Sequence, residues 1–346
     1  MKLATNYLRS CISHMRQFNL KRIALTKTTK LIHIRIIFLI AILTIVIQPL
    51  KSHPTSTCTV DKWRLEIEAL NDKIEQLFIT KNINTLVGLY ADEFTYFPEY
   101  KPAIFKSNEL KEFLTDWFKA ANIKTYKKKI YQVEVYSGYM LEMGTFRFDY
   151  FAIDKKDKEY EGHYMILWKR NGSGRLSIVS ETFGANKYIE PQDVPYASVK
   201  LVKSSVTPTP RVIDQIYTDV LAFDAIVLKA VAEGDGDARA KGFTEDAILM
   251  ANFDSIRVGM EAIRPKMLKT YTMDVSYKVN HTYFRVYDLG EYVFVTSHYK
   301  GGWGDTINGG RFEGNISNLM KRNGNGKLLM HRQAGNRDSA LVTSNQ

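Results

Sequence analysis

Apolar residues recur at helical spacing in two separate segments of the chain, one beginning near residue 63 and one near residue 212. In both segments, large apolar side chains follow one another at steps of mostly three and four residues. They are Trp63, Ile67, Leu70, Ile74, Leu77 and Phe78 in the first segment, and Val212, Ile216, Val220, Phe223, Val227 and Val231 in the second. This spacing places them on one face of a helix, and Gly234 marks the end of the second helix.

Each long helix is followed by patterns that predict two more helices. A short helix is expected at about 84–91 in the first segment and at about 236–243 in the second. A third helix is expected after Ser107, whose hydroxyl suits an N-cap. Its inner side carries Leu110, Phe113, Leu114, Trp117 and Phe118. The counterpart from Met260 to Lys269 contains Pro265, so we expect it to be short or kinked.

The rest of each half is rich in β-branched and aromatic residues, which favour strands. The expected strands are 130–136, 140–151, 163–169 and 176–183 in the first half, and 275–286, 292–299, 312–321 and 327–333 in the second. Helices followed by a meander of hairpin-linked strands predict an α+β fold. We expect two tandem cone-like domains, each a curved antiparallel sheet packed against about three N-terminal helices.

A sequence repeat supports this division. The segments 169–176 (KRNGSGRL) and 321–328 (KRNGNGKL) are identical at six of eight positions, and further matches occur in the same order along the chain. Such a long-range repeat indicates duplication. A stretch with four prolines lies between the copies and is typical of a linker. We therefore expect domains at 61–188 and 211–340, joined by a Pro-containing linker at 189–210.

The net charge of +11 belongs largely to the N-terminus. Residues 1–60 hold nine of the 48 basic residues and none of the 37 acidic ones, so the remainder is near neutral. This distribution removes the main argument for a nucleic-acid partner.

The same N-terminal segment has the layout of an export signal. A basic stretch ends at Arg35, and a mostly apolar run from Ile36 to Ile47 follows. We expect residues 1–60 to be an export signal or membrane anchor with a short spacer, and the protein to be periplasmic or extracellular. Membrane contact is expected only through this segment, with 36–47 as the anchor if it is retained. Cleavage, lipidation of Cys58, and the choice between Met1 and Met15 as the start stay open.

Several motifs resemble the NTF2-like superfamily, in particular its SnoaL-like or DUF4440-like branch. In the first copy they are the segment 90–94 (YADEF) after the helices and the strands that close on 168–181. The second copy is similar at 244–247 (TEDA) and 319–328. The resemblance covers roughly 62–188 and 211–337. It implies a cone-shaped sheet wrapped by helices, a pocket at the mouth of the cone, and pairing of the two copies with each other.

Ketosteroid-isomerase-like members of that superfamily place a basic aspartate immediately before a proline, after the second helix. Here Phe97 precedes Pro98, and the second copy has Met250 followed by Ala251. Neither side chain can accept a proton. The resemblance therefore implies the fold without implying that isomerisation.

Other polar and aromatic residues on the expected strands supply the candidate site. The catalytic candidates are His163, Glu181 and Asp149, because a histidine beside a carboxylate can act as an acid–base pair. The candidates for ligand binding are Tyr96, Phe97, Tyr100, Arg147, His298 and His331. The opposing interpretation is that strand alternation places many of them on a solvated face or in the core.

Cofactor chemistry finds no support in the sequence. Both cysteines, Cys11 and Cys58, precede the expected domains, and the histidines show no metal-ligand spacing. The glycine-rich segment 301–304 falls between two expected strands, where a hairpin explains it better than a phosphate-binding loop. We therefore expect no metal and no cofactor.

Three functions remain open. The leading hypothesis is an exported, non-catalytic module that binds a small apolar or amphipathic molecule or a protein partner. An alternative is a SnoaL-like cyclase, hydrolase or isomerase with acid–base residues in the cone of the first domain, which requires His163 to point inward. A further alternative is a structural pseudo-dimer that serves assembly. Oligomeric state and ligand identity stay open.

Overall fold

A computed structural model describes residues 57–152, 156–201, 204, 207–209, 214–304, 308–339 and 342–345. The predicted export segment lies outside the described residues, except for its last four positions. Among the helices that are described, none has the length and apolarity needed to cross a membrane.

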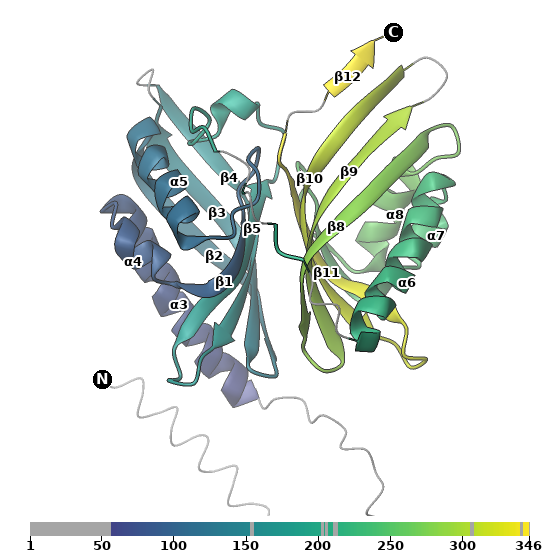
Figure 1. Cartoon of the computed structure of the whole chain (residues 1–346), viewed down its shortest axis with the longest axis horizontal. Coiled ribbons are helices and arrows are strands. Elements are labelled where there is room, and N and C mark those ends of the chain that lie inside the picture. The colour runs from purple at the N-terminus through teal and green to yellow at the C-terminus, as the bar shows by residue number, and fades with distance from the viewer. Residues whose placement is uncertain are drawn as a thin grey trace, which may run out of the picture. The chain divides into compact units, whose positions relative to one another are not determined.

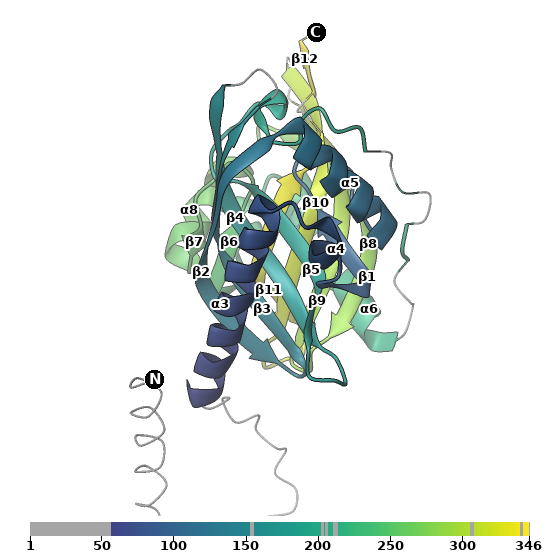
Figure 2. The same ribbon diagram turned by 90° about the vertical axis from the view of Figure 1, so that its left-hand side faces the viewer.

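Among the residues that the structure describes, the N-terminal half contains one five-stranded sheet, three α-helices and a short 3-10 helix at Pro191–Asp193 (Figure 1). The helices are α3 (Thr57–Ile79), α4 (Ile83–Val87) and α5 (Ser107–Ala120). The strands are β1 (Tyr90–Phe97), β2 (Asn122–Tyr136), β3 (Tyr139–Phe151), β4 (Asp157–Arg170) and β5 (Leu176–Ala185), in the order β1-β5-β4-β3-β2. Figure 2 shows α3 and α5 lying across this sheet.

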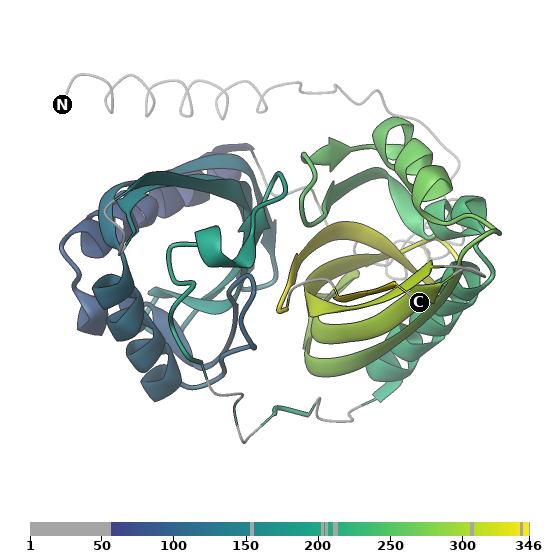
Figure 3. The ribbon, with the colours of Figure 1, turned by 90° about the horizontal axis from the view of Figure 1, so that it is seen from above.

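The C-terminal half repeats this arrangement. Its helices are α6 (Asp214–Ala232), α7 (Gly236–Ala240) and α8 (Met260–Thr270). Its strands are β6 (Phe243–Met250), β7 (Arg257–Val258), β8 (Ser276–Asp288), β9 (Tyr292–Gly304), β10 (Asn308–Arg322), β11 (Leu328–Arg337) and β12 (Val342–Asn345). The order is β7-β6-β11-β10-β9-β8, and β12 pairs with β10. Seen from above, each sheet curls around its own interior (Figure 3).

The predicted α+β class is confirmed, with one difference in the sheets. Each sheet is mixed, because β1 pairs in parallel with β5 and β6 pairs in parallel with β11. Neither β1 nor β6 was among the expected strands, and the short helices expected at about 84–91 and 236–243 end earlier, at Val87 and Ala240. In both strands the third and fourth residues are exposed and the last four are all buried, so the alternation typical of a strand is weak.

Two local predictions are corrected, and a third is confirmed. The N-cap of α5 is Lys106 rather than Ser107, which is the first residue of the helix. The segment 301–304 is the end of β9 rather than a hairpin. Helix α8 contains Pro265 and has 11 residues, whereas α5 has 14, so the expected shortening is confirmed.

The repeated KRNG motifs form the same turn in both halves. Asn171 Oδ1 accepts hydrogen bonds from the backbone N–H groups of Ser173 and Arg175, at 3.1 and 2.9 Å. Asn323 Oδ1 accepts from the corresponding groups of Asn325 and Lys327, both at 3.0 Å. Glycine follows in each turn with a positive φ, 82° at Gly174 and 75° at Gly326, a conformation that glycine adopts without strain.

Each sheet has two differently used faces. One face packs against the helices of its own half and forms the core of that half. The other faces of the two sheets share a third apolar cluster, which includes Met143 and Met165 from the N-terminal half and Phe294 and Leu319 from the C-terminal half. Polar contacts join the same faces: Arg332 Nη2 lies 2.6 Å from Glu134 Oε1, and Thr182 Oγ1 lies 2.6 Å from Ser317 Oγ. We call the face of each sheet that points away from its own helices, toward the other half, its outer face.

Part of the predicted linker belongs structurally to the N-terminal core. Val194, Tyr196 and Val199 are buried in that core, and the Tyr196 ring lies 4.7 Å from the Trp117 ring. Lys101 Nζ donates to the carbonyl oxygens of Ala197 and Val199. This segment therefore packs against the N-terminal half instead of running free between the halves.

Candidate functional site

The interior of the N-terminal cone is filled by aromatic side chains. Tyr126 and Phe148 stack with their ring centroids 3.9 Å apart, and Phe78 and Trp117 pack against Phe148 at 5.6 and 5.5 Å. The cavity left among these residues has a volume of about 10 Å³. A space of that size holds one water molecule at most. A ligand pocket at this position, as the sequence resemblance implied, is absent among the described residues.

A buried carboxylate completes the filled interior. Glu142 is fully buried and accepts hydrogen bonds from Asn71 Nδ2, Tyr164 OH and Trp168 Nε1, at 2.6, 2.7 and 2.8 Å. The Nζ atom of the buried Lys128 lies 3.6 Å from Glu142 Oε1. Because its oxygens are already bonded and its charge is paired, Glu142 supports the fold and is not free for a ligand.

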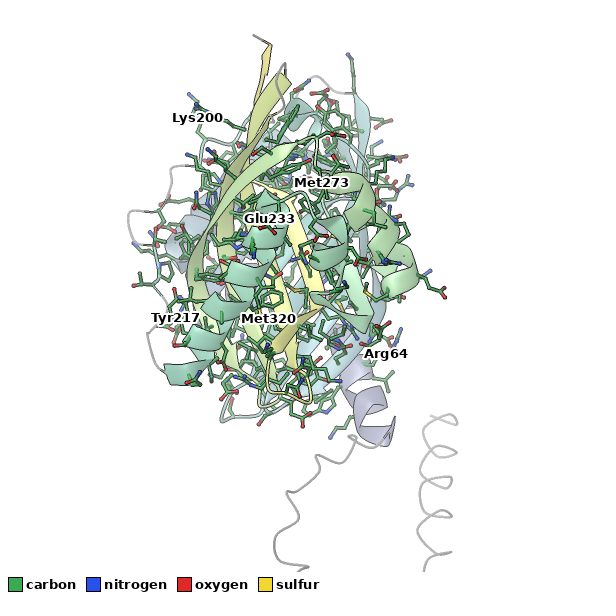
Figure 4. All side chains as sticks on the ribbon, turned by 90° about the vertical axis from the view of Figure 1, so that its right-hand side faces the viewer. Arg64, Lys200, Tyr217, Glu233, Met273 and Met320 are labelled. Carbon is green, nitrogen blue, oxygen red and sulfur yellow. The ribbon has the colours of Figure 1, made fainter. Side chains whose placement is uncertain are left out.

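The C-terminal cone encloses a cavity of about 640 Å³ between its sheet and its helices. Figure 4 views the molecule from the side of these helices and labels Met320, which is one of the lining residues. The apolar and aromatic lining includes Phe223, Val227, Val231, Leu249, Met250, Val279, Trp303, Phe312, Ile316, Met320 and Met330. A concave, mostly apolar space of this volume is typical of small-molecule sites.

The difference between the halves follows from four corresponding positions. An offset of 152 residues aligns Tyr164, Trp168 and Phe183 of the filled cone with Ile316, Met320 and Gly335. On the neighbouring strand, Phe148 pairs with Tyr160, and Gly301 pairs with Phe312. Because the same offset of 152 aligns Tyr160 with Phe312, Gly301 occupies the position of Phe148. Each substitution removes aromatic volume from the interior. The open cavity is therefore encoded by smaller side chains on an equivalent framework.

A histidine–aspartate pair lies in the wall of the C-terminal cavity. Helix α6 supplies Asp224 and strand β8 supplies His281, and His281 Nδ1 lies 2.6 Å from Asp224 Oδ1. The His281 side chain is 16 % exposed and the Asp224 side chain is 13 % exposed. Tyr283 lies next to the pair, and burial followed by the charge of Asp224 raises the pKa of its hydroxyl. This cluster can accept or donate a proton within an apolar space.

The same cavity contains a buried cation. Arg239, on α7, is 6 % exposed, and its guanidinium lies 4.5 Å from the centre of the Phe243 ring. Its Nη1 has no hydrogen-bond partner. Burial lowers the pKa of Arg239, and contacts with Tyr271 partly oppose that shift. A buried guanidinium with an unused donor is a favourable position for an anionic group.

Amides and a second guanidinium complete the polar lining. Gln333 Nε2 donates to Asn318 Oδ1 at 2.9 Å. Both side-chain amide atoms of Asn252 and the Nη1 atom of Arg337 are buried without hydrogen-bond partners. These groups can orient a ligand, because an unpaired buried polar group gains free energy when it acquires a partner.

The structure separates the three predicted catalytic residues. His163 is 1 % exposed and lies on the outer face of β4, beside the backbone of Met250. Glu181 points into the filled cone, where Tyr90 OH donates to it. Asp149 lies on the outer face of β3 and contacts Thr125 and Arg147. Because His163 points away from the cone, the acid–base pair required in the first domain does not form.

The predicted ligand-binding residues of the first domain are also structural. Tyr96 is 3 % exposed and packs in the filled core. Phe97 lies on the outer face, with its ring 6.0 Å from that of Phe284. Tyr100 has a φ of 59° and donates its hydroxyl to the Ile189 carbonyl at 2.8 Å. Arg147 is exposed and pairs with Asp149 and Glu159. None of these four contributes to an open cavity.

The two predicted histidines of the second domain lie outside its cavity. His298 Nε2 lies 2.8 Å from Asp338 Oδ2 on the outer face of the C-terminal sheet. His331 is buried, and its Nδ1 lies 3.0 Å from Thr244 Oγ1. Burial, and then the charge of Arg332, lowers the pKa of His331 to about 4.

Three polar residues of the cavity wall, His281, Asp224 and Arg239, were not among the candidates for catalysis or ligand binding. A signal existed: an offset of 153 aligns Asn71 with Asp224 and Lys128 with His281. In the C-terminal half the two side chains contact each other, whereas in the N-terminal half both contact Glu142.

No protein-family model matches the sequence, and no curated protein is similar enough to count as a relative. Solved structures that resemble part of the chain include a ketosteroid isomerase-like protein from Erwinia carotovora atroseptica, with 18% identity and a TM-score of 0.33. That match covers 37% of this chain and 100% of the other. An NTF-2 like protein of unknown function from Shewanella oneidensis matches with 15% identity and a TM-score of 0.30, covering 35% and 98%. ActVI-ORFA from Streptomyces coelicolor matches with 13% identity and a TM-score of 0.34, covering 37% and 100%.

Proposed function

We propose that this protein is an exported small-molecule-binding protein and that its ligand occupies the cavity of the C-terminal half. The observation that carries the proposal is the volume of about 640 Å³ with a mostly apolar lining, in a chain whose other cone is filled. Apolar burial supplies the affinity, and a few convergent polar groups orient the ligand. The filled N-terminal half contributes rigidity to the structure and has no ligand of its own.

The ligand is amphipathic and carries an acidic group. Two arginines line the cavity with unused donors, Arg239 and Arg337. The one carboxylate in the lining, Asp224, is already paired with His281. An anionic head group beside a guanidinium forms a charge-assisted hydrogen bond, and an apolar body fills the remaining space.

Dodecanoate and dodecanol test this proposal, because they share an apolar chain and differ in the head group. We expect calorimetry to show binding of both, with dodecanoate binding more tightly. Replacing Arg239 with Met is expected to weaken dodecanoate binding by about tenfold or more, because it removes a charged hydrogen bond. Dodecanol binding is expected to change little.

A cavity-filling variant provides the matched test of location. Gly335→Phe introduces the residue that Phe183 supplies in the filled cone. A Cβ atom at Gly335 would lie 3.5 Å from its nearest neighbours, the Asn315 carbonyl oxygen and the Ile316 side chain, which is ordinary van der Waals contact. We expect this variant to fold and to lose binding of both probes. Gly324→Phe, in an exposed turn with open space around it, is the control. Unchanged binding in Gly335→Phe would contradict the proposed site.

The His281–Asp224 pair favours a second candidate function, acid–base catalysis on the bound molecule. Asp224 can hold the imidazole in one orientation while the ring transfers a proton. Proton exchange at the carbon atoms next to the carbonyl of 2-dodecanone in D₂O would reveal this activity by mass spectrometry. Exchange that is abolished in His281→Asn would establish catalysis, and exchange at the buffer rate in the wild type would exclude it for this ketone.

A further inference from the structure

Three potential metal ligands converge on the outer face of the C-terminal sheet, away from the large cavity. They are His298 on β9, Glu313 on β10 and Asp338 after β11. One ligand atom from each lies within 4.8 Å of the others, and His298 Nε2 is 2.8 Å from Asp338 Oδ2. His298 and Glu313 lie on the adjacent strands β9 and β10, and Asp338 directly follows β11, so the paired backbone of the sheet brings the three side chains together.

A fourth residue gives independent evidence for a ligand at this position. Asn315 is fully buried, and neither its Oδ1 nor its Nδ2 has a hydrogen-bond partner. It pairs directly with His298 across β9 and β10, so the two side chains lie side by side on the same face. Burial of an amide without partners costs free energy, which a ligand in the adjacent space would recover.

These four residues line a common cavity of about 240 Å³. Its other walls come from Thr282 and Phe284, from Pro102, Ala103 and Phe105 of the N-terminal half, and from Ser204 and Thr207. Asp338 Oδ1 is also buried without a hydrogen-bond partner. The space therefore contains an unused carboxylate oxygen and an unused amide oxygen beside an imidazole.

We propose that His298, Glu313 and Asp338 bind a divalent transition-metal ion, with Zn²⁺ as the preferred ion and Asn315 contributing its amide oxygen. One imidazole and two carboxylates are ligands that Zn²⁺ accepts, and two negative charges balance those of the ion.

Lys300 is the cation nearest to this set and does not block it. Its Nζ lies 3.8 Å from Glu313 Oε2, and its side chain is 72 % exposed. An exposed pair of this kind contributes little free energy, so Lys300 can turn toward solvent when a metal ion binds. The site draws its residues from the outer face and is independent of the ligand cavity.

Calorimetric titration of the chelator-treated chain with Zn²⁺ tests the proposal, and the visible absorption of Co²⁺ reports the ligand set. We expect the wild type to bind one Zn²⁺ ion per chain. His298→Asn and Asp338→Asn are expected to bind Zn²⁺ at least about tenfold more weakly than the wild type. His331→Asn is the matched control, because His331 also neighbours a carboxylate, that of Asp246, at 3.4 Å on the same sheet.

The outcomes are distinguishable even if a variant folds poorly. Zn²⁺ is expected to raise the melting temperature of the wild type and of His331→Asn, and to leave that of Glu313→Gln nearly unchanged. No stoichiometric binding by the wild type would overturn the proposal. Equal affinity in the wild type and in His298→Asn would overturn it as well, because the metal would then lie elsewhere.

Discussion

Asp224 and His281 occupy the positions in the C-terminal half that Asn71 and Lys128 occupy in the N-terminal half. Asp224 Oδ1 and His281 Nδ1 lie 2.6 Å apart at the edge of an open cavity. Asn71 instead donates to Glu142, which also pairs with Lys128 inside a filled core. The same two backbone positions thus hold a titratable pair where there is room for a ligand, and part of a closed network where there is none.

Replacing Asp224 with Ala is expected to destabilise the protein by about 1–3 kcal/mol, because it leaves a half-buried imidazole without its partner. Asp224→Asn is expected to cost much less, since an amide oxygen can still accept from His281 Nδ1. Urea unfolding of both variants measures the difference. Equal losses in the two variants would show that the negative charge, rather than the hydrogen bond, stabilises the pair.

Phe148 and Gly301 are expected to respond to substitution in opposite ways. Phe148→Ala removes a buried, stacked ring and should cost about 3–5 kcal/mol. Gly301→Ala adds a methyl group that would lie 2.5 Å from the Lys278 carbonyl oxygen and 2.9 Å from the Phe312 ring. Such overpacking should cost about 1–3 kcal/mol. Thermal unfolding measures both, and a stabilised Gly301→Ala would contradict the packing described for β8, β9 and β10.

The elements of this fold could be largely predicted from the sequence, because helical spacing and β-rich composition act locally. The long helices, the later strands of each half and the identical turns at Asn171 and Asn323 follow from short-range patterns. The strands β1 and β6 could not, since their pairing partners in β5 and β11 lie almost 90 residues away. Their weak alternation gives no local signal that a strand forms.

Which cone holds an open cavity could not be predicted, for a different physical reason. Aromatic residues such as Tyr96 were candidates for ligand binding or for the core, and in the N-terminal cone they fill the interior. Whether a cone is open depends on the summed volume of side chains that meet from separate strands. Gly301 lies opposite Phe312 only in the observed register. The offset between the halves changes from 153 in β9 to 152 in β10, because the paired residues Gly304 and Gly309 are five positions apart, whereas Phe151 and Asp157 are six apart. Register of this kind is not visible in the local pattern.

His163 is expected to make the protein less stable in acid. Burial lowers its pKa from 6.5 to about 4 in the folded state. Between these values the unfolded chain binds a proton that the folded chain does not, so stability falls as the pH falls from 6.5 to 4. The full shift corresponds to about 3 kcal/mol. Urea unfolding of the wild type and of His163→Gln across this pH range should show that the free energy of unfolding falls more steeply with pH in the wild type. An equal pH dependence in the two proteins would contradict a lowered pKa of His163.

Glu99 is expected to act in the opposite direction. Burial raises its pKa from 4.5 to about 7, although hydrogen bonds from Tyr160 and the Ala185 backbone partly oppose the shift. The folded chain therefore retains a proton that the unfolded chain has released, and stability falls as the pH rises from 4.5 to 7, by about 3 kcal/mol in full. Glu99→Gln mimics the protonated form. The free energy of unfolding of Glu99→Gln, relative to that of the wild type, should rise from pH 4.5 to 7 and stay constant above pH 7, as urea unfolding would measure.

The ion pair between Glu134 and Arg332 links β2 of the N-terminal half to β11 of the C-terminal half. Both side chains are largely buried, at 14 % and 5 % exposure, and Glu134 also accepts from Gln132 and Tyr136. Arg332→Leu leaves a buried carboxylate without its cation and should cost about 3–5 kcal/mol. The double variant Glu134→Leu with Arg332→Leu should recover part of that loss, because no unpaired charge remains. A double-mutant cycle in urea measures the coupling between the halves, and strictly additive losses would show that the pair does not couple them.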